Sequence, residues 1–254
     1  MRAGLGLWMP VTAAALLHGC ALTSNEPDPD GAPPAEDLSD SDWARSSRLV
    51  AGDIAWMHLR FRGRKPSQYR STLHQGRPAI AAFSEGGSSV MRQKMTRPAQ
   101  QPSQLAWSWW VDTLPSGFDV RARETDDAVA RVIITFDGDR SNFSPRDAVL
   151  SELALLLTGE PLPHATLEYL WDARLPVGTV LQSAYSSRVR YVVAESGAAR
   201  LSQWVDIQRD VQADFARAFN EPPTAVTGVG LMTDTNDTQA IAQAWFGPMR
   251  WAAR

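Results

Sequence analysis

The sequence predicts a mainly β protein, an antiparallel sandwich of two sheets with one or two short helices. Ten short segments are rich in β-branched and aromatic residues and are separated by Pro, Gly, Asp and Ser, which is typical of strands and turns. Nowhere do strand and helix patterns alternate regularly, as a parallel sheet with crossover helices would require. These two observations together favour packed antiparallel sheets over an α/β fold.

Many of the predicted strands have apolar residues at every second position. In the segment 118–124, Phe118, Val120 and Ala122 share one face and alternate with charged residues, as expected of a strand with one wet face. The ten segments are residues 54–62, 79–83, 105–112, 118–124, 129–136, 166–171, 188–194, 204–208, 226–232 and 245–251.

Two helices interrupt this pattern. Residues 144–147 read Ser-Pro-Arg-Asp, which places a hydroxyl cap, a first-turn proline and an acid at a helix start, and Gly159 ends the segment. The second helix covers residues 210–220, where a Val and two Phe residues recur at every fourth position and form one apolar stripe.

The first nineteen residues resemble a bacterial secretory signal. Arg2 gives a short positive start, and the apolar run 5–17 is too short for a spanning helix, which needs about 20 apolar residues. The order Leu-His-Gly-Cys at 17–20 resembles the lipobox of bacterial lipoproteins, in which the cysteine is acylated and the signal is removed. We therefore expect a signal peptide at 1–19 and lipidation of Cys20. The alternative is a plain secretory signal with an incidental cysteine.

The cysteine count favours the lipidated form. Cys20 is the only cysteine, so an exported chain has no internal disulfide, and acylation gives the lone thiol a purpose. Stable anchoring takes more than one acyl chain, which lipoprotein processing supplies. Ala21 and not an aspartate follows the cysteine, and this resembles the enterobacterial signal for sorting to the outer membrane. The resemblance implies a lipoprotein of the bacterial outer membrane that faces the periplasm, with the membrane as a partner.

The segment after the cysteine is predicted to be a tether. Residues 24–42 contain seven carboxylates, several prolines and no basic residue, and they cannot bury enough apolar surface to fold alone. We expect residues 20–42 to be an acidic tether and residues 43–254 to be a single sandwich domain. The remaining charges give the domain about +3, which excludes the strongly basic surface of a nucleic-acid binder.

Several stretches of the domain resemble a bacterial domain-of-unknown-function family, number 3047. They include the Trp-Ser-Trp-Trp-Val run, an Asp-Asp pair before a strand, Tyr-Leu-Trp, and Met-Thr-Asp-Thr-Asn-Asp-Thr; these lie at 107–111, 126–127, 169–171 and 232–238. The resemblance implies a jelly-roll sandwich and no assigned activity. Asn236 and Asp237 stand in the reverse of the family's order, and Asn220 replaces a glycine.

The Asp126-Asp127 pair is a first candidate for ligand binding. Adjacent side chains at a strand start point to opposite faces, so the two carboxylates are not expected to act as one acid–base pair. Either could face the sheet edge and help to hold a cation. The alternative is that they cap a turn or pair with Arg131 or Arg123.

The loop 233–238 is a second candidate, because it is dense in side-chain oxygens. Asp234, Asn236 and Asp237 are the ligand-binding candidates here, and Asp127, Asp234 and Asp237 would be the ligands of a calcium ion. The loop lacks the glycine and glutamate of a helix–loop–helix calcium site. A turn in which these residues bond to one another is the alternative.

Tryptophan is abundant, with ten residues in the chain. Trp107 and Trp109 share one face of their strand and are expected in the core, as are Trp171 and Trp204. Trp110 points to the other face and is the best surface candidate for stacking on a sugar ring.

Standard catalytic motifs are missing from the sequence. No Gly-x-Ser-x-Gly elbow, dinucleotide loop or zinc-ligand spacing occurs, and His58, His74 and His164 are isolated. The leading prediction is a non-catalytic envelope protein that binds a glycan or similar polar ligand. The alternatives are a glycan-cleaving or glycan-modifying enzyme with Asp127, Glu168 or Asp234 as acid and base, and an envelope assembly protein with an apolar docking surface.

Overall fold

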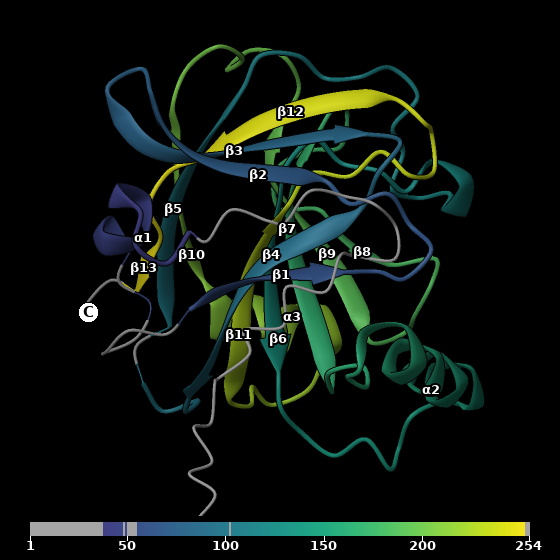
Figure 1. The fold of residues 1–254 in the computed structure, drawn as a ribbon. Helices are drawn as coiled ribbons and strands as arrows, with labels where there is room; N and C mark the ends of the chain where they lie inside the picture. The colour runs from purple at the N-terminus through teal and green to yellow at the C-terminus, as the bar shows by residue number, and fades with distance from the viewer. Residues whose placement is uncertain (1–37, 48, 50–54, 102, 252–254) are drawn as a thin grey trace, which may run out of the picture.

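The chain folds into two β-sheets packed face to face, which confirms the predicted sandwich (Figure 1). The structure is a computed structural model that describes residues 38–47, 49, 55–101 and 103–251. The predicted signal peptide, Cys20 and most of the predicted tether lie outside the described residues.

The seven-stranded sheet carries the candidate site on its outer face. Its strands, in spatial order, are β1 (Trp56–Arg60), β4 (Ser89–Arg97), β11 (Val226–Met232), β6 (Arg131–Phe136), β7 (Ala165–Asp172), β9 (Val189–Ser196) and β8 (Val180–Gln182). Neighbours run antiparallel except β7 and β9, which are parallel because the chain crosses to the edge strand β8 before it returns as β9.

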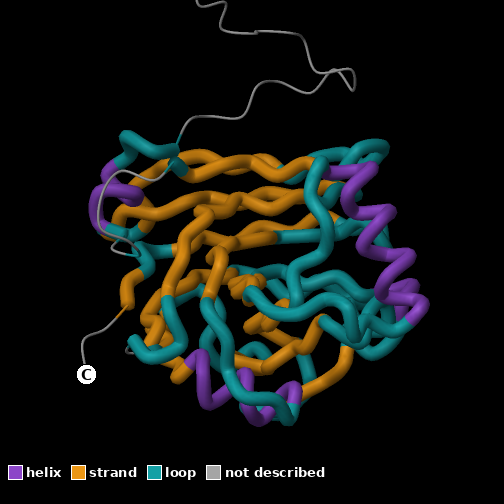
Figure 2. Tube along the Cα trace, turned by 90° about the horizontal axis from the view of Figure 1, so that it is seen from below, coloured by secondary structure: helices purple, strands orange, loops and turns teal. Residues whose placement is uncertain are grey.

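The six-stranded sheet forms the other layer of the sandwich. Its spatial order is β10 (Val205–Asp210), β5 (Gln104–Val111), β12 (Ile241–Phe246), β3 (Arg77–Glu85) and β2 (Gln68–His74), with the short β13 (Arg250–Trp251) paired to β5. The tube view in Figure 2 shows the loops that join the two layers around their edges.

The core between the sheets is rich in aromatic residues. Trp107 and Trp109 of β5 point inward as predicted, and the Trp109 ring centroid lies 5.9 Å from that of Trp171 on β7. The helix α3 (Val211–Phe219) adds Phe215, whose ring lies 4.5 Å from Phe136. Burial of these large side chains is the main source of stability.

Both predicted helices are present, and their ends match the expected capping residues. α2 (Pro145–Thr158) begins after the Ser144 cap and ends at Gly159, which has a left-handed backbone with φ of 76°. α3 ends at Asn220 with φ of 54°, and Asn tolerates this conformation better than other residues that have a side chain. In the described part of the chain, no helix is long and apolar enough to cross a bilayer.

A short helix that was not predicted, α1 (Asp42–Ser46), joins the N-terminal segment to the core. Its Trp43 is fully buried, with its ring centroid 4.6 Å from that of Trp56. Leu38, which falls in the segment predicted as a tether, is fully buried as well. The packed structure therefore includes residues before position 43.

The predicted strand at 118–124 is wrong. This segment forms turns that lead into the 3-10 helix η1 (Arg123–Thr125), because Asp119 closes a local loop. The Asp119 N–H donates to the Thr125 carbonyl at 2.9 Å, and the Asp119 carboxylate accepts from the Arg121 side chain. The alternating pattern was there, but local side-chain bonds compete with strand pairing.

The predicted strand at 245–251 is also wrong in its limits. β12 begins four residues earlier, at Ile241, and ends at Phe246, because Gly247 and Pro248 interrupt pairing before β13. The strands β2, β4 and β8 were not predicted. β2 and β4 carry many polar and charged residues on their outer faces, which hid their strand character.

Candidate functional site

A cleft of about 620 Å³ lies on the outer face of the seven-stranded sheet. Alternation along β6 produces its floor: Val132 and Ile134 belong to the core, whereas Arg131, Ile133 and Thr135 line the cleft. Neighbouring strands contribute in the same way, so the cleft crosses β4, β11, β6, β7 and β9. α2 and the segment 160–164 border it on one side.

Two glycines of β11 keep the floor of the cleft open. A Cβ atom at Gly230 would lie 2.8 Å from Val90 Cγ1, and one at Gly228 would lie 2.9 Å from Thr135 Oγ1. Side chains at these positions would also project into the cleft that both residues line. The Gly-Val-Gly order inside a strand is therefore explained by close packing at the floor.

One half of the cleft is apolar. Val90, Ile133 and Met232 form a small cluster on the outer face of the sheet, and the half-buried Leu59 and Phe61 pack against it. All five side chains line the cleft. This half offers a surface for the apolar part of a ligand.

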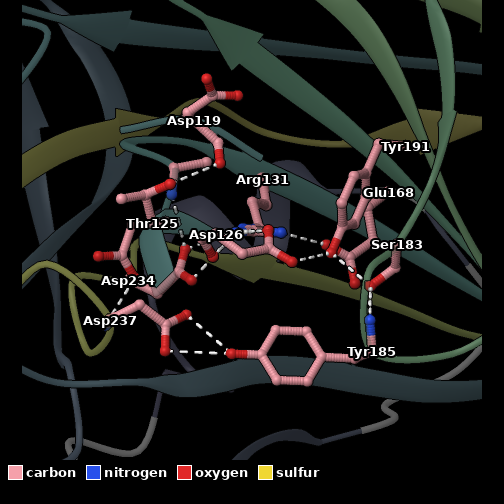
Figure 3. A network of polar contacts seen from close by, with 12 residues as sticks. Asp119, Thr125, Asp126, Arg131, Glu168, Ser183, Tyr185, Tyr191, Asp234 and Asp237 are labelled. Atoms are coloured by element: carbon pink, nitrogen blue, oxygen red, sulfur yellow. Dashed lines mark hydrogen bonds and ion pairs between the residues drawn. The ribbon is translucent and has the colours of Figure 1, made fainter. Parts of the chain in front are cut away.

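The other half is built around the buried side chain of Arg131, which three carboxyl groups surround (Figure 3). The guanidinium donates from Nε to Asp234 Oδ1 at 2.8 Å and from Nη1 to Glu168 Oε2 at 2.8 Å. Nη2 donates to the Asp126 backbone oxygen at 2.6 Å. We call these four residues, Arg131, Asp126, Glu168 and Asp234, the Arg131 cluster. The side chain of Glu168 is 14% exposed and the other three are at most 4% exposed, so Glu168 is the member that a ligand can reach.

Tyr191 completes the cluster from β9. Its hydroxyl donates to Asp126 Oδ2 at 2.7 Å and lies 2.9 Å from Ser183 Oγ, and its ring centroid lies 5.4 Å from Arg131 Cζ. Asp126 is therefore held on both sides, by a cation and by a phenol. The aromatic face next to the guanidinium adds a cation–π contact.

The Arg131 cluster contains three carboxyl groups and one guanidinium, so a single positive charge would face three negative ones if all three acids were ionised. Burial raises the pKa of Asp234 to about 7, and it also raises the pKa values of Asp126 and Glu168, although Arg131 opposes the shift in each case. The carboxylates in return raise the pKa of Arg131, which stays charged. The cluster therefore binds protons at pH values where ordinary carboxyl groups are ionised.

Asp237 and Tyr185 lie at the polar rim of the cleft. The Tyr185 hydroxyl is 3.1 Å from Asp237 Oδ1 (Figure 3). The Asn236 amide donates to the same oxygen at 2.9 Å. Burial and the charge of Asp127 raise the pKa of Asp237. Asn236 and Asp237 both line the cleft, so the reversed order of the two residues still presents a carboxylate to it.

Asp127 points away from the cleft and fixes the loop 236–238. Its carboxylate accepts from the Thr238 N–H at 2.7 Å, from the Thr238 hydroxyl at 2.6 Å and from the Asp237 N–H at 3.1 Å. The two aspartates of the pair thus face opposite ways, and Asp126 is paired with Arg131. The structural role of Asp127 takes it out of the candidate acids and bases.

The calcium ligands expected from sequence are engaged with protein donors. Asp234 is bound to Arg131, Asp127 to the loop backbone, and Asp237 to Tyr185 and Asn236. Among the described residues, no group of three or more acidic, His or Cys side chains could hold a metal ion. The loop is a turn in which side chains bond to neighbouring residues.

The structure places Trp110 on the opposite side of the molecule from the cleft. It lies on the outer face of the six-stranded sheet, where it pairs with Trp245 across β5 and β12 and contacts His74 edge-on at 4.8 Å. Trp204 belongs to this outer cluster, its ring centroid 5.9 Å from that of Trp110, so its expected place in the core is wrong. The ligand-binding candidates therefore divide between two surfaces.

The sequence did not single out Arg131 as a functional residue, and it gave no sign of Tyr185 or Tyr191. From sequence, Arg131 is only one of two candidate partners, with Arg123, of the Asp126-Asp127 pair. A signal was present, because a charged residue at the start of the otherwise apolar segment 131–136 requires buried partners. The contacts of Tyr191 depend on the parallel pairing of β7 with β9, which no local pattern indicates.

A model of a protein family described as "Protein of unknown function (DUF3047)" matches residues 54–250. This range runs from just before β1 to the first residue of β13 and contains the whole cleft. No curated protein matches the chain.

Two solved structures show a distant likeness. One is the xyloglucanase domain of NopAA, a type three effector from Sinorhizobium fredii, in complex with cellobiose; it has 8% identity and a TM-score of 0.42, over 79% of this chain and 94% of that one. The other is an ENZbleach xylanase mutant with 9% identity and a TM-score of 0.33, over 85% of this chain and 93% of that one. Likeness at these scores carries no information on the activity of this chain.

Proposed function

The chain belongs to the DUF3047 family, whose function is unknown, and from the geometry of this member we propose that it binds a glycan or a similarly polar ligand in the cleft over Arg131. The division of the cleft into two halves supports this proposal. The carboxyl and hydroxyl groups of the polar half suit the hydroxyls of a sugar, and the apolar half suits the C–H face of its ring. A volume of about 620 Å³ is within the range of small-ligand sites.

Glu168 is the residue that we expect to contact the ligand first. Within the described part of the chain, its side chain has one hydrogen bond, which Oε2 accepts from Arg131, so Oε1 remains for a ligand hydroxyl. Arg131 is held from several sides and keeps Glu168 in one position. A preorganised acceptor of this kind costs little conformational entropy when the ligand binds.

A cleft-filling substitution tests this proposal. Thr166 lies on β7 two residues before Glu168 and lines the cleft, and among the described residues its side chain has no hydrogen bond to the Arg131 cluster. Thr166→Trp should therefore fill the cleft and keep the hydrogen bonds of the cluster. Wild type is first screened on an array of bacterial envelope and plant glycans, and the affinity of each positive glycan is then measured by titration calorimetry. We expect Thr166→Trp to weaken binding at least tenfold.

Thr72→Trp is the matched control, because it makes the same change at an exposed strand position on the other sheet. It should bind as wild type does. Trp110→Ala tests the outer aromatic cluster in the same assay. Loss of binding in Trp110→Ala together with normal binding in Thr166→Trp would contradict the assignment to the cleft.

Catalysis on a glycan is a second candidate, which one observation favours. Glu168 lines the cleft, is reachable by a ligand and has a raised pKa, as a general acid requires. Glu168→Gln keeps the acceptor for Arg131 but cannot donate a proton. If glycans that bind are also cleaved by wild type, measured as new reducing ends, this variant should lose cleavage and keep binding.

We also propose that the protein is a lipoprotein of the bacterial cell envelope, acylated at Cys20. The lipobox-like order at 17–20 and the lack of any other cysteine support this. Growth with a labelled fatty acid should label the wild-type chain and not Cys20→Ser. An equal label in both, with both in the membrane fraction, would contradict acylation at this residue.

A further inference from the structure

The helix α2 is oriented so that its apolar side faces outward. Its two buried residues are polar, Asp147 and Ser151, and the cleft-lining Thr158 continues the same inner stripe. Five of the nine exposed large apolar side chains among the described residues belong to this one helix, and they are Val149, Leu153, Leu155, Leu156 and Leu157. A soluble surface helix normally has the reverse arrangement.

Asp147 fixes this orientation. Its Oδ1 accepts from the Ser186 hydroxyl at 2.6 Å and from the Ser187 N–H at 3.1 Å, and its Oδ2 accepts from the Ser144 hydroxyl at 2.6 Å. The Ser187 hydroxyl donates to the same carboxylate. Since the first turn is held by an acid at the inner side, the helix cannot rotate its leucines inward without breaking these bonds.

The outward stripe is contiguous. Val149, Leu153 and Leu156 are spaced by four and three residues, so they lie on one face, and they are 68%, 46% and 74% exposed. Figures 1 and 2 place α2 at the periphery of the molecule. Each leucine would gain about 1.5–3 kcal/mol from full burial, which is a strong drive toward an apolar partner.

We propose that this face of α2 docks on the surface of the lipid bilayer to which the N-terminus is anchored. The inference rests on the proposed anchoring at Cys20. Seventeen residues lie between Cys20 and the buried Leu38. A chain of this length spans at most roughly 60 Å, so anchoring at Cys20 would hold the domain within that distance of the bilayer. At such a high local concentration even a weak helix–lipid affinity gives stable docking.

The helix has the features of an interfacial segment. At 14 residues it is too short to span a bilayer, and it would lie in the plane of the headgroups. Arg146 in its first turn and Arg140 in the preceding loop are both exposed. Each guanidinium donates to one backbone carbonyl, that of Ala184 and that of Leu162, and its other N–H groups can reach lipid phosphates. Ala154 and Thr158 of the same helix line the cleft, so docking would place the cleft beside the membrane surface.

The test uses the full chain, purified from bacterial membranes and reconstituted in phosphatidylcholine vesicles with a quarter phosphatidylglycerol. Cys20 is the only native cysteine, so Leu156→Cys adds a single site for an environment-sensitive NBD dye. The chain without this substitution, treated with the same dye, measures any labelling of Cys20. Thr72→Cys, at an exposed position of β2, is the matched control. We expect nitroxide-labelled lipids to quench the dye at position 156 at least threefold more than the dye at position 72.

Equal quenching at the two positions would overturn the proposal. A blue-shifted dye at position 156 that lipid nitroxides do not quench, and that responds to protein concentration, would also overturn it and would identify a second copy of the chain as the partner. Leu153→Gln with Leu156→Gln should reduce quenching of a dye placed at Val149→Cys, and it should leave glycan binding in the cleft unchanged. If Thr166→Trp loses glycan binding but shows normal quenching, the docking of α2 on the bilayer does not depend on ligand binding in the cleft.

Discussion

At the scale of single residues, Arg131 has the largest consequences for stability. Its guanidinium is the only cation that contacts the buried carboxyl groups of Asp126, Glu168 and Asp234 in the described part of the chain. Breaking a buried ion pair from one side leaves charges without a partner, which is more costly than losing the attraction itself.

We predict that Arg131→Met lowers the free energy of unfolding by about 3–5 kcal/mol at pH 8, measured by urea denaturation. Methionine keeps most of the volume of the side chain but leaves three acids unpaired. Arg121→Met is the control, because Arg121 pairs with Asp119 at the surface. Its substitution should leave the free energy of unfolding without a measurable change. Similar decreases in the free energy of unfolding of the two variants would show that the Arg131 cluster stabilises the fold no more than a surface ion pair does.

The sequence singled out the acidic members of this site and missed the cation that organises them. Asp126 was prominent because it stands in an Asp-Asp pair, and Asp234 because it stands in a loop of polar residues. The pairing of Arg131 with Asp234, more than 100 residues away, depends on β6 and β11 being neighbours in the sheet. Sequence spacing alone carries no information on that neighbourhood.

At the scale of elements, helices were easier to predict than strands because capping is local. Ser144 and Gly159 marked α2 correctly, whereas the alternation at 118–124 produced a false strand, since Asp119 bonds within its own turn. The sequence of α2 did not predict that its polar side faces inward and its apolar side outward. This orientation follows from Ser186 and Ser187, which lie beyond β7 and β8 and hold Asp147.

We predict that Asp147→Ala loosens α2 without unfolding the sandwich. The variant keeps the Ser144 cap, because the cap accepts from the backbone N–H of residue 147. It removes the carboxylate that accepts from the hydroxyls of Ser144, Ser186 and Ser187, with an expected loss of about 1–3 kcal/mol. Hydrogen exchange followed by mass spectrometry should show faster exchange in residues 145–158 and 183–188, and unchanged exchange in β6 and β7. Glu152→Ala, on the exposed side of the same helix, should exchange as wild type does.

At the scale of the whole molecule, the cluster makes stability depend on pH. The pKa of Asp234 is about 7 in the folded chain and 3.8 ordinarily, so the folded state binds more protons between these values. Its contribution is complete below pH 4 and is lost as the pH rises through 7. Acids whose pKa values are lowered in the fold, such as Glu160 and Glu221, lose their contribution only on further acidification, so they do not offset this trend above pH 5. Burial lowers the pKa of His74, which opposes the trend below pH 6.5, but it is one group against the three acids of the cluster.

We therefore predict that the free energy of unfolding falls by a few kcal/mol between pH 5 and pH 8, as measured by urea denaturation. Glu168→Gln removes one of the three acids and keeps an acceptor for Arg131, so its stability should change less over the same range. A wild-type protein that is more stable at pH 8 than at pH 5 would contradict the assignment of excess protons to the cluster.

The folded domain extends beyond the residues that the family model matches. The family match begins at residue 54, yet Leu38 and Trp43 are fully buried in the same core as the sandwich. We predict that Trp43→Ala lowers the free energy of unfolding by about 3–5 kcal/mol, because it removes a large side chain packed on Trp56. Trp251→Ala, at the half-buried end of β13, should cost clearly less. A fragment that begins at residue 54 should lose at least as much free energy of unfolding as Trp43→Ala does. Equal urea midpoints for the fragment and the full chain would mean that the core is complete without the N-terminal segment.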